Sequence, residues 1–83
     1  MPHYMRRPKN AIYINPSNSL KHEIKKMEIC YEFRQAGIDF ITEAVPNDRD
    51  NRRVDIVNLK TGDEIEIETN PKINKEGALT IHI

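Results

Sequence analysis

The chain has 83 residues, which is enough for one domain and too few for two. Lys and Arg together number 13, as do Asp and Glu, so the formal net charge is zero and tight non-specific binding to nucleic acid is not expected. Only 37% of the residues are hydrophobic, and a chain this short buries a modest share of its surface, so we expect a marginal core supplemented by a homodimer.

No segment marks the chain for export or membrane insertion. It has no secretory leader and no run of about 18 apolar residues. Cys30 is the only cysteine, which excludes an internal disulfide and fits a reducing compartment. We therefore expect a cytoplasmic protein in which Cys30 is an inert thiol of the core.

Residues 1–18 are predicted to form an N-terminal arm, and residues 19–83 are predicted to form the single domain. The arm carries Pro2, Pro8 and Pro16 and one apolar patch over residues 11–14. This composition predicts a mobile arm that contains a short strand or a docking segment.

One good helix is predicted from Leu20 to Ala36. Ser19 or Asn18 is suited to its N-cap, and Gly37 stands where a helix ends in the left-handed conformation. Apolar residues recur at helical spacing and predict a wide face laid on a sheet; they are Leu20, Ile24, Met27, Tyr31, Ile29, Phe33 and Ala36.

Strands are predicted in the rest of the domain. The first runs from Ile38 to Val45, with Ile41 and Glu43 on one face and Thr42 and Ala44 on the other. Two strands over residues 53–59 and 64–69 flank a turn with Gly62 and form a β-hairpin. A last strand over residues 78–83 either completes the sheet or pairs with another subunit. The predicted fold is α+β, with one helix on a small mixed sheet.

Acidic side chains gather on this hairpin. Glu66 and Glu68 share a face of one strand, and Asp55 on the other is expected opposite Ile67 or Glu68. Two carboxylates ~4 Å apart repel by about 4 kcal/mol at an effective dielectric constant of 20. A hard cation such as Mg²⁺ or Mn²⁺ would relieve this repulsion, so the pattern suggests a metal site on Asp55, Glu66 and Glu68. An acidic, solvated hairpin face is the alternative.

Other charged residues are candidates for the same site. His22 and Lys26 lie one helical turn apart and could approach a scissile phosphate, or could be a rim histidine and a lysine that extends to solvent. Glu43 could join the metal ligands or lie exposed on the surface. Three arginines before Asp55 could hold phosphates or solvate their loop: Arg49, Arg52 and Arg53.

The order and spacing of these segments resemble the PD-(D/E)XK superfamily, which includes restriction endonucleases and Holliday-junction resolvases. The stretches that carry the resemblance are the helix 20–36, Phe40-Ile41-Thr42-Glu43-Ala44, Arg53-Val54-Asp55-Ile56-Val57 and Glu66-Ile67-Glu68-Thr69-Asn70. The resemblance implies a minimal restriction-endonuclease-like core, with Asp55 and Glu66 as metal ligands. It covers about 52 of 83 residues.

Three departures from the family pattern bear on activity. Glu68 occupies the position of the family's lysine, Val54 that of its proline, and no second core helix is expected after residue 70. Glu68 would then be a third ligand or a general base, and Lys26 would supply the missing positive charge. The resemblance implies a Mg²⁺-dependent endonuclease that cleaves DNA. Two alternatives stay open: an inactive nuclease-fold module that binds nucleic acid or a protein, and a purely structural protein.

Overall fold

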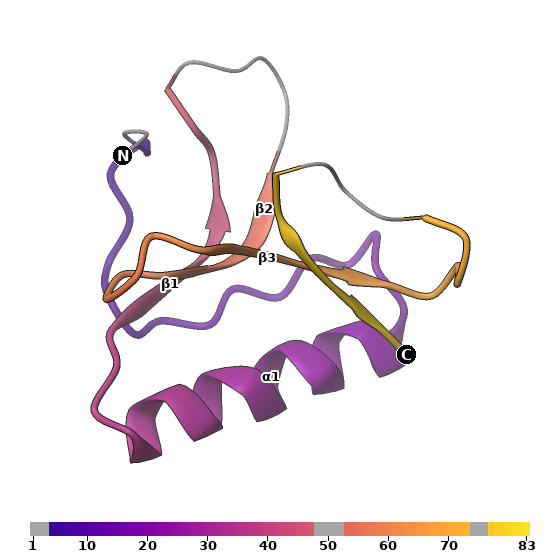
Figure 1. Ribbon diagram of the computed structural model, residues 1–83, viewed down its shortest axis with the longest axis horizontal. Helices are drawn as coiled ribbons and strands as arrows, with labels where there is room; N and C mark the ends of the chain where they lie inside the picture. Colours follow the sequence, from indigo (N-terminus) through magenta and orange to yellow (C-terminus); the bar gives the residue numbers. More distant parts are fainter. Residues whose placement is uncertain (1–3, 48–52, 74–76) are drawn as a thin grey trace.

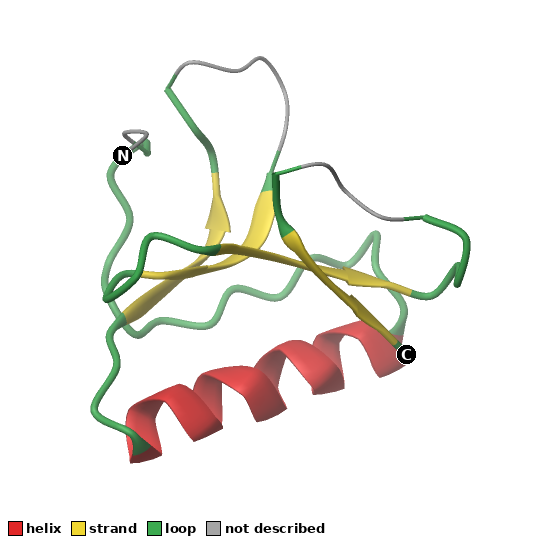
Figure 2. Cartoon of the chain, viewed as in Figure 1, coloured by secondary structure: helices red, strands yellow, loops and turns green. Residues whose placement is uncertain are grey.

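The structure is a computed structural model that describes residues 4–47, 53–73 and 77–83. Within these ranges the chain forms one helix and four strands (Figures 1 and 2). They are α1 (Leu20–Gln35), β1 (Phe40–Ala44), β2 (Val54–Asn58), β3 (Glu64–Glu68) and β4 (Leu79–His82). None of the helical segments described is long and apolar enough to cross a membrane.

The four strands form one mixed sheet in the order β1-β2-β3-β4. The β1–β2 and β2–β3 pairs are antiparallel, and β4 lies parallel to β3. Gly62, at a φ of 82°, lies in the turn of the predicted β2–β3 hairpin. With α1 packed on this sheet the fold is α+β, as predicted, and β4 completes the sheet of its own chain.

Local signals set both ends of α1. Ser19 is the N-cap, and its Oγ accepts a hydrogen bond from the backbone N–H of His22 at 3.2 Å. Gly37 has a φ of 73°, a left-handed value that glycine adopts without the steric cost of a Cβ. The predicted caps are therefore confirmed.

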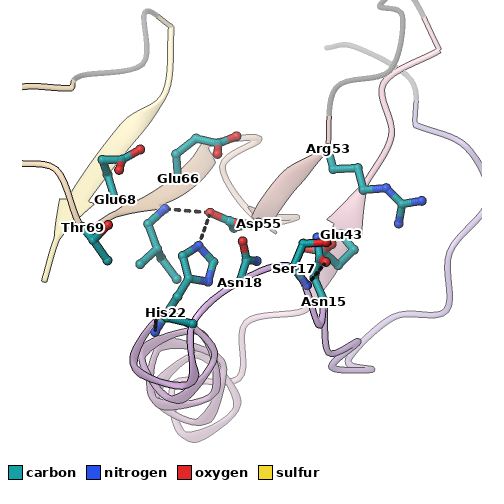
Figure 3. Close-up of a pocket in the computed structure, with 12 residues that line it drawn as sticks. Asn15, Ser17, Asn18, His22, Glu43, Arg53, Asp55, Glu66, Glu68 and Thr69 are labelled. Carbon is teal, nitrogen blue, oxygen red and sulfur yellow. Dashed lines mark hydrogen bonds and ion pairs between the residues drawn. The ribbon is translucent and has the colours of Figure 1, made fainter.

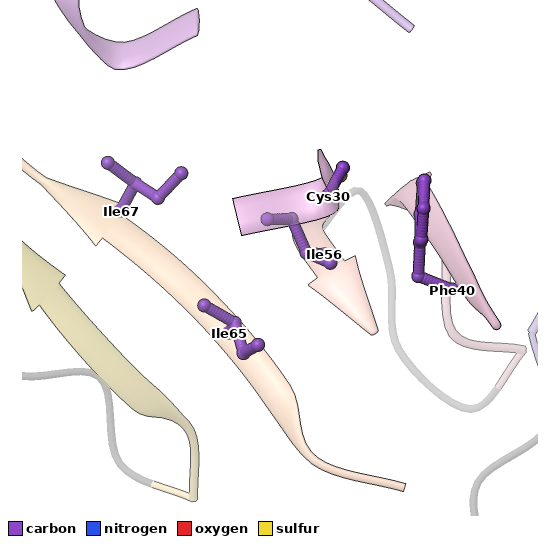
Figure 4. Close-up of a cluster of buried hydrophobic side chains, with 5 residues drawn as sticks. All are labelled: Cys30, Phe40, Ile56, Ile65 and Ile67. Atoms are coloured by element: carbon purple, nitrogen blue, oxygen red, sulfur yellow. The ribbon is translucent and has the colours of Figure 1, made fainter. Parts of the chain in front are cut away.

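The sheet-facing side of α1 agrees with the prediction in part: Ile29 and Phe33 pack against the core as expected, but other residues of the predicted apolar face do not. Cys30 joins a core cluster with Phe40, Ile56, Ile65 and Ile67 (Figure 4). The other buried residues of α1 are polar: His22 and Lys26. Leu20, Ile24, Met27 and Tyr31 were expected in this face but are exposed. Helical spacing identifies an apolar row without showing what it packs against, so the predicted face is wider than the side that meets the sheet.

A second cluster covers the opposite face of the sheet and interrupts the predicted alternation of side chains. Ala44 and Val54 pack here beside Ile41 and Val57, with Tyr4 and Leu59 against them. The backbone of Glu43 has a φ of 49°, a left-handed value that is uncommon for a residue other than glycine. Because of this conformation, Glu43 turns toward α1 and Ala44 toward the other face, so the prediction that Glu43 shares a face with Ile41 is wrong.

The arm is docked on the domain over its described part, residues 4–18. The backbone N–H of Met5 donates to Val45 O at 2.8 Å, and that of Asn10 donates to Phe40 O at 2.7 Å. The chain then runs back between α1 and the sheet, where Thr42 Oγ1 bonds the backbone of Ala11 and Tyr13 (Figure 1). The arm was predicted to be mobile and to contain a short strand or a docking segment. The structure shows the docking segment.

Candidate functional site

A polar pocket of about 380 Å³ lies where the N-terminal end of α1 approaches the adjoining parts of β2 and β3 (Figure 3). We call it the acidic pocket. Four carboxylates, one histidine and one arginine line it, together with polar side chains from the arm; the charged and histidine residues are Glu43, Asp55, Glu66, Glu68, His22 and Arg53. All four predicted ligands, Asp55, Glu66, Glu68 and Glu43, therefore border the same cavity.

Asp55 lies at the point where the ladder between β2 and β3 stops. The ladder pairs Ile56 with Ile65 and Val57 with Glu64. Extended by one residue, this register places Asp55 opposite Glu66, one to two positions from the predicted partners Ile67 and Glu68. Instead of pairing through its backbone, Asp55 accepts the backbone N–H of Ile67 with its side-chain Oδ2 at 2.8 Å. The carboxylate is thus fixed between the two strands.

His22 holds the same carboxylate from the helix side. Its Nε2 lies 3.2 Å from Asp55 Oδ2, and its Nδ1 lies 3.1 Å from Glu23 Oε1. Figure 3 shows Asp55 between His22 and Glu66. Burial raises the pKa of Asp55, and the hydrogen bond from Ile67 and the positive charges of His22 and Lys26 only partly oppose this rise.

Lys26 lies beneath the pocket and not in it. Its side chain is fully buried, and its Nζ contacts Glu23 Oε2 at 2.8 Å, Glu43 Oε2 at 3.1 Å and the carbonyl oxygen of Tyr13 at 3.1 Å. These acceptors match the three donors of an ammonium group. The predicted contact of Lys26 with a phosphate, as a catalytic or DNA-binding residue, does not agree with this placement.

Glu43 is also committed to this internal network. It is 2% exposed, and while its Oε2 accepts from Lys26, its Oε1 accepts from Asn15 Nδ2 at 2.9 Å. The alternative that Glu43 lies exposed on the surface is therefore wrong, while its role as a metal ligand stays a prediction, with each of its oxygens already accepting one hydrogen bond. It forms one wall of the pocket.

Glu66, Glu68 and Arg53 also line the pocket and differ in their exposure. Glu66 is buried, Glu68 is half-buried, and Arg53 is exposed at the start of β2. The Oε1 of Glu68 accepts the backbone N–H of Asn70 at 3.0 Å. Arg49 and Arg52, the other predicted nucleic-acid contacts, lie outside the described residues.

The carboxylates do not form a closed metal cage. Over the described ranges, no three His, Cys, Asp or Glu side chains are grouped closely enough to hold a metal ion together. The convergence of Asp55, Glu66 and Glu68 on one shared cation is therefore not present in the structure. Mg²⁺ needs only one or two protein carboxylates, since water fills its remaining positions, so a donor set of Asp55 and Glu66 is chemically sufficient.

Three residues that position the site were not predicted from the sequence to do so: Glu23, Asn18 and Asn15. Glu23 receives hydrogen bonds from Lys26 and from Asn18 Nδ2, the latter at 2.8 Å, and Asn15 reaches Glu43. Although burial raises the pKa of Glu23, these hydrogen bonds and the charge of Lys26 hold it below its usual value. The Glu23–Lys26 spacing of three residues was the available signal.

Comparison of the chain with models of known protein families, with curated proteins and with solved structures finds no match. The function is therefore inferred from the chemistry of the acidic pocket.

Proposed function

We propose that this protein is a metal-dependent phosphodiesterase of the endonuclease type, with DNA as its substrate. The observation that carries this proposal is the placement of Asp55. A buried carboxylate is fixed by a backbone N–H and a histidine at the wall of an open polar pocket, where it faces a second acid-bearing strand. Perturbed carboxylates in a cleft are typical of functional sites.

Asp55 and Glu66 are the residues that would hold Mg²⁺ or Mn²⁺. Both donors of Asp55 in the described chain contact Oδ2, which leaves Oδ1 for a ligand. When bound, such an ion polarises a phosphate and lowers the pKa of water. Because the pKa of Asp55 is raised by burial, a nearby positive charge also stabilises the ionised form of this carboxylate.

The other pocket residues have roles that their positions support. His22 orients Asp55 from α1, and Glu68 lies two positions from Glu66, where its carboxylate can accept a proton from an attacking water. Arg53 and the N-terminal end of α1 border the same pocket, and both attract a phosphate group.

The resemblance to the PD-(D/E)XK superfamily supports this proposal through the order of elements. The helix, the strand after it, the strand with Asp55 and the strand with Glu66 follow one another as the resemblance implies. The departure at Glu68 is not compensated by Lys26, since that ammonium is buried in its own ion pairs.

This departure favours a second candidate function. Lys26 already pairs with Glu43, so among the described residues that line the acidic pocket Arg53 and His22 are left to offset Asp55, Glu66 and Glu68. A module of this fold that binds nucleic acid or a protein partner without cleaving it would not need the positive charge that the family's lysine supplies to the reaction. Salt-dependent binding in the absence of cleavage would select this function.

The test is a cleavage assay on labelled single-stranded, duplex and branched DNA, with an RNA oligonucleotide of matched sequence, in Mg²⁺ or Mn²⁺. We expect the parent to cleave DNA, and Asp55→Asn or Glu66→Gln to lose at least about 100-fold in rate, as for loss of a group central to the reaction. Absence of cleavage by the parent in either metal would overturn the proposal.

Glu64→Gln is the matched control for Glu66→Gln. Glu64 is a buried glutamate of the same strand, outside the acidic pocket, and its Oε2 accepts a hydrogen bond from Tyr4 Oη at 2.7 Å. An amide oxygen can also accept this bond, so cleavage by Glu64→Gln should equal that of the parent. Equal loss in both glutamine variants would assign the effect to the strand and not to the pocket.

A further inference from the structure

The outward face of α1 carries an apolar row that the described part of the chain leaves exposed. We call Leu20, Ile24, Met27 and Tyr31 the α1 stripe; these residues are between 44% and 76% exposed. Grooves of about 320 and 410 Å³ run along its two sides, the first lined by Ile12 and Ile14 of the arm. A contiguous apolar surface of this kind marks an interaction site.

The spacing of the α1 stripe fits another helix. Its residues are separated by four, three and four positions, which is the spacing of the buried seam of a coiled coil. The series reads the same from either end. Two copies of α1 packed antiparallel would therefore place Leu20 opposite Tyr31 of the second copy, and Ile24 opposite Met27 of the second copy.

The charges beside the stripe fit the same arrangement. Lys21 and Glu28 follow Leu20 and Met27 directly, so both lie on one flank of the seam, and both are exposed. In an antiparallel pair this flank meets its own copy, so each Lys21 would face Glu28 of the second copy. A parallel pair would lack this complementarity, because this flank would then meet the opposite flank of the second copy instead of its own.

We infer that α1 is the interface of a twofold homodimer in which two copies of the helix pack antiparallel through the α1 stripe. A standard interface covers about 800 Å² per partner, which is about one seventh of the 5561 Å² that the chain exposes. One face of the molecule can supply this area. The acidic pocket borders the N-terminal end of α1, so the two pockets would lie toward opposite ends of the helix pair.

The test measures the dissociation constant of the full chain by sedimentation equilibrium, with a charge-swap series. We expect the parent to dimerise, and Lys21→Glu or Glu28→Lys alone to weaken the dimer at least tenfold. The double variant should return to near the parent value, because it restores opposite charges across the interface. Met27→Glu should be monomeric, and Lys60→Glu, in the exposed hairpin turn, should dimerise like the parent.

Mixing the two single variants tests the antiparallel geometry directly. A Lys21→Glu chain and a Glu28→Lys chain complement each other on both sides of the twofold axis, so native mass spectrometry should find mainly the heterodimer. No preference for the heterodimer would overturn the antiparallel arrangement. A monomeric parent at about 100 μM would overturn the dimer. A dimer unaffected by Met27→Glu would place the interface elsewhere, for example at the outer edge of β4. Circular dichroism confirms that each variant keeps its helix.

Discussion

Asp55 combines two properties that a cation-binding carboxylate needs, a fixed position and an unfavourable environment for its charge. The N–H of Ile67 and the ring of His22 fix its Oδ2, while burial disfavours the ionised form. A buried carboxylate that is ionised at neutral pH lowers the free energy of unfolding, unless a bound ligand offsets the cost of burying its charge. Functional sites commonly carry such a cost in stability.

The stability of Asp55→Asn should depend on pH in a defined direction. The raised pKa of Asp55 means that the folded state holds its proton more tightly than the unfolded chain, so the parent loses stability as pH rises from the usual aspartate range through the raised value. Asparagine carries no such charge. We expect the free energy of unfolding of Asp55→Asn, relative to the parent, to rise as pH increases from the usual aspartate pKa through the raised pKa of Asp55, measured by urea denaturation over a pH series.

Asp39→Asn is the control of opposite sign. A hydrogen bond from Asn10, with the nearby charges of Lys9 and Arg34, lowers the pKa of the Asp39 carboxyl, which lies on the surface. Its ionised form therefore stabilises the fold above the usual aspartate pKa, and the variant should lose stability relative to the parent as pH rises. The same direction of change in both variants would contradict the account of Asp55.

At the residue scale, the sequence identified most of the pocket through chemistry and order in the chain. Asp55, Glu66 and Glu68 border one cavity because the hairpin was predicted correctly. The sequence could not show that Asp55 would turn its side chain to the backbone of Ile67, since that depends on where the β2–β3 ladder stops. Nor could it show Glu43 in a left-handed conformation, which reverses the face of that side chain.

At the element scale, the Lys26 network connects three segments that meet at the pocket. Lys26 from α1 binds Glu43 of β1 and the carbonyl oxygen of Tyr13 in the arm, and Asn15 of the arm binds Glu43 in turn. These contacts position the pocket wall without exposing the charges. A buried ion pair is weak evidence for added stability, but removal of one partner leaves the other charge buried and unpaired.

Lys26→Met should therefore be strongly destabilising. It keeps an unbranched apolar side chain but removes the ammonium, so Glu43 stays buried without its counter-charge, at a cost of about 3–5 kcal/mol in unfolding free energy. Adding Glu43→Gln should recover part of this loss, with a coupling energy of about 2 kcal/mol in the double-mutant cycle. Chemical denaturation of the two single variants and the double variant gives this value.

Lys25→Met provides the comparison for this effect. It makes the same chemical change one position earlier, where Lys25 is partly exposed and reaches Glu28 at 3.7 Å. A solvent-exposed pair of this kind contributes at most about 1 kcal/mol. A loss of stability in Lys26→Met no larger than that in Lys25→Met would show that the buried network does not hold the three segments together.

The elements themselves were largely predictable, but the width of the helix face that packs on the sheet was not, because Ile29 and Phe33 pack there whereas Leu20 and Tyr31 do not. Caps, turn residues and strand patterns are local signals, and they correctly placed α1, the hairpin and β4. The orientation of α1 depends on its neighbours. The buried row contains His22 and Lys26, whose burial becomes favourable only once Asp55, Glu23 and Glu43 are present as partners.

At the scale of the whole molecule, a small chain with two modest apolar clusters has little stability in reserve. Ligand binding to the folded state should then have a visible effect on thermal unfolding. A ligand at 100 times its dissociation constant adds about 2.7 kcal/mol. For a domain of this size, each kcal/mol raises the melting temperature by about 4–8 °C.

We therefore expect Mn²⁺ to raise the melting temperature of the parent by about 10 °C or more at 100 times its dissociation constant, and EDTA to reverse the rise. The shift should be smaller at pH 5 than at pH 7, because protons compete with the cation for Asp55, whose pKa is raised. Glu64→Gln should respond like the parent, whereas Asp55→Asn should show little shift. An equal shift in Asp55→Asn would place the bound cation away from Asp55, and the assignment of the acidic pocket as a metal site would then be wrong.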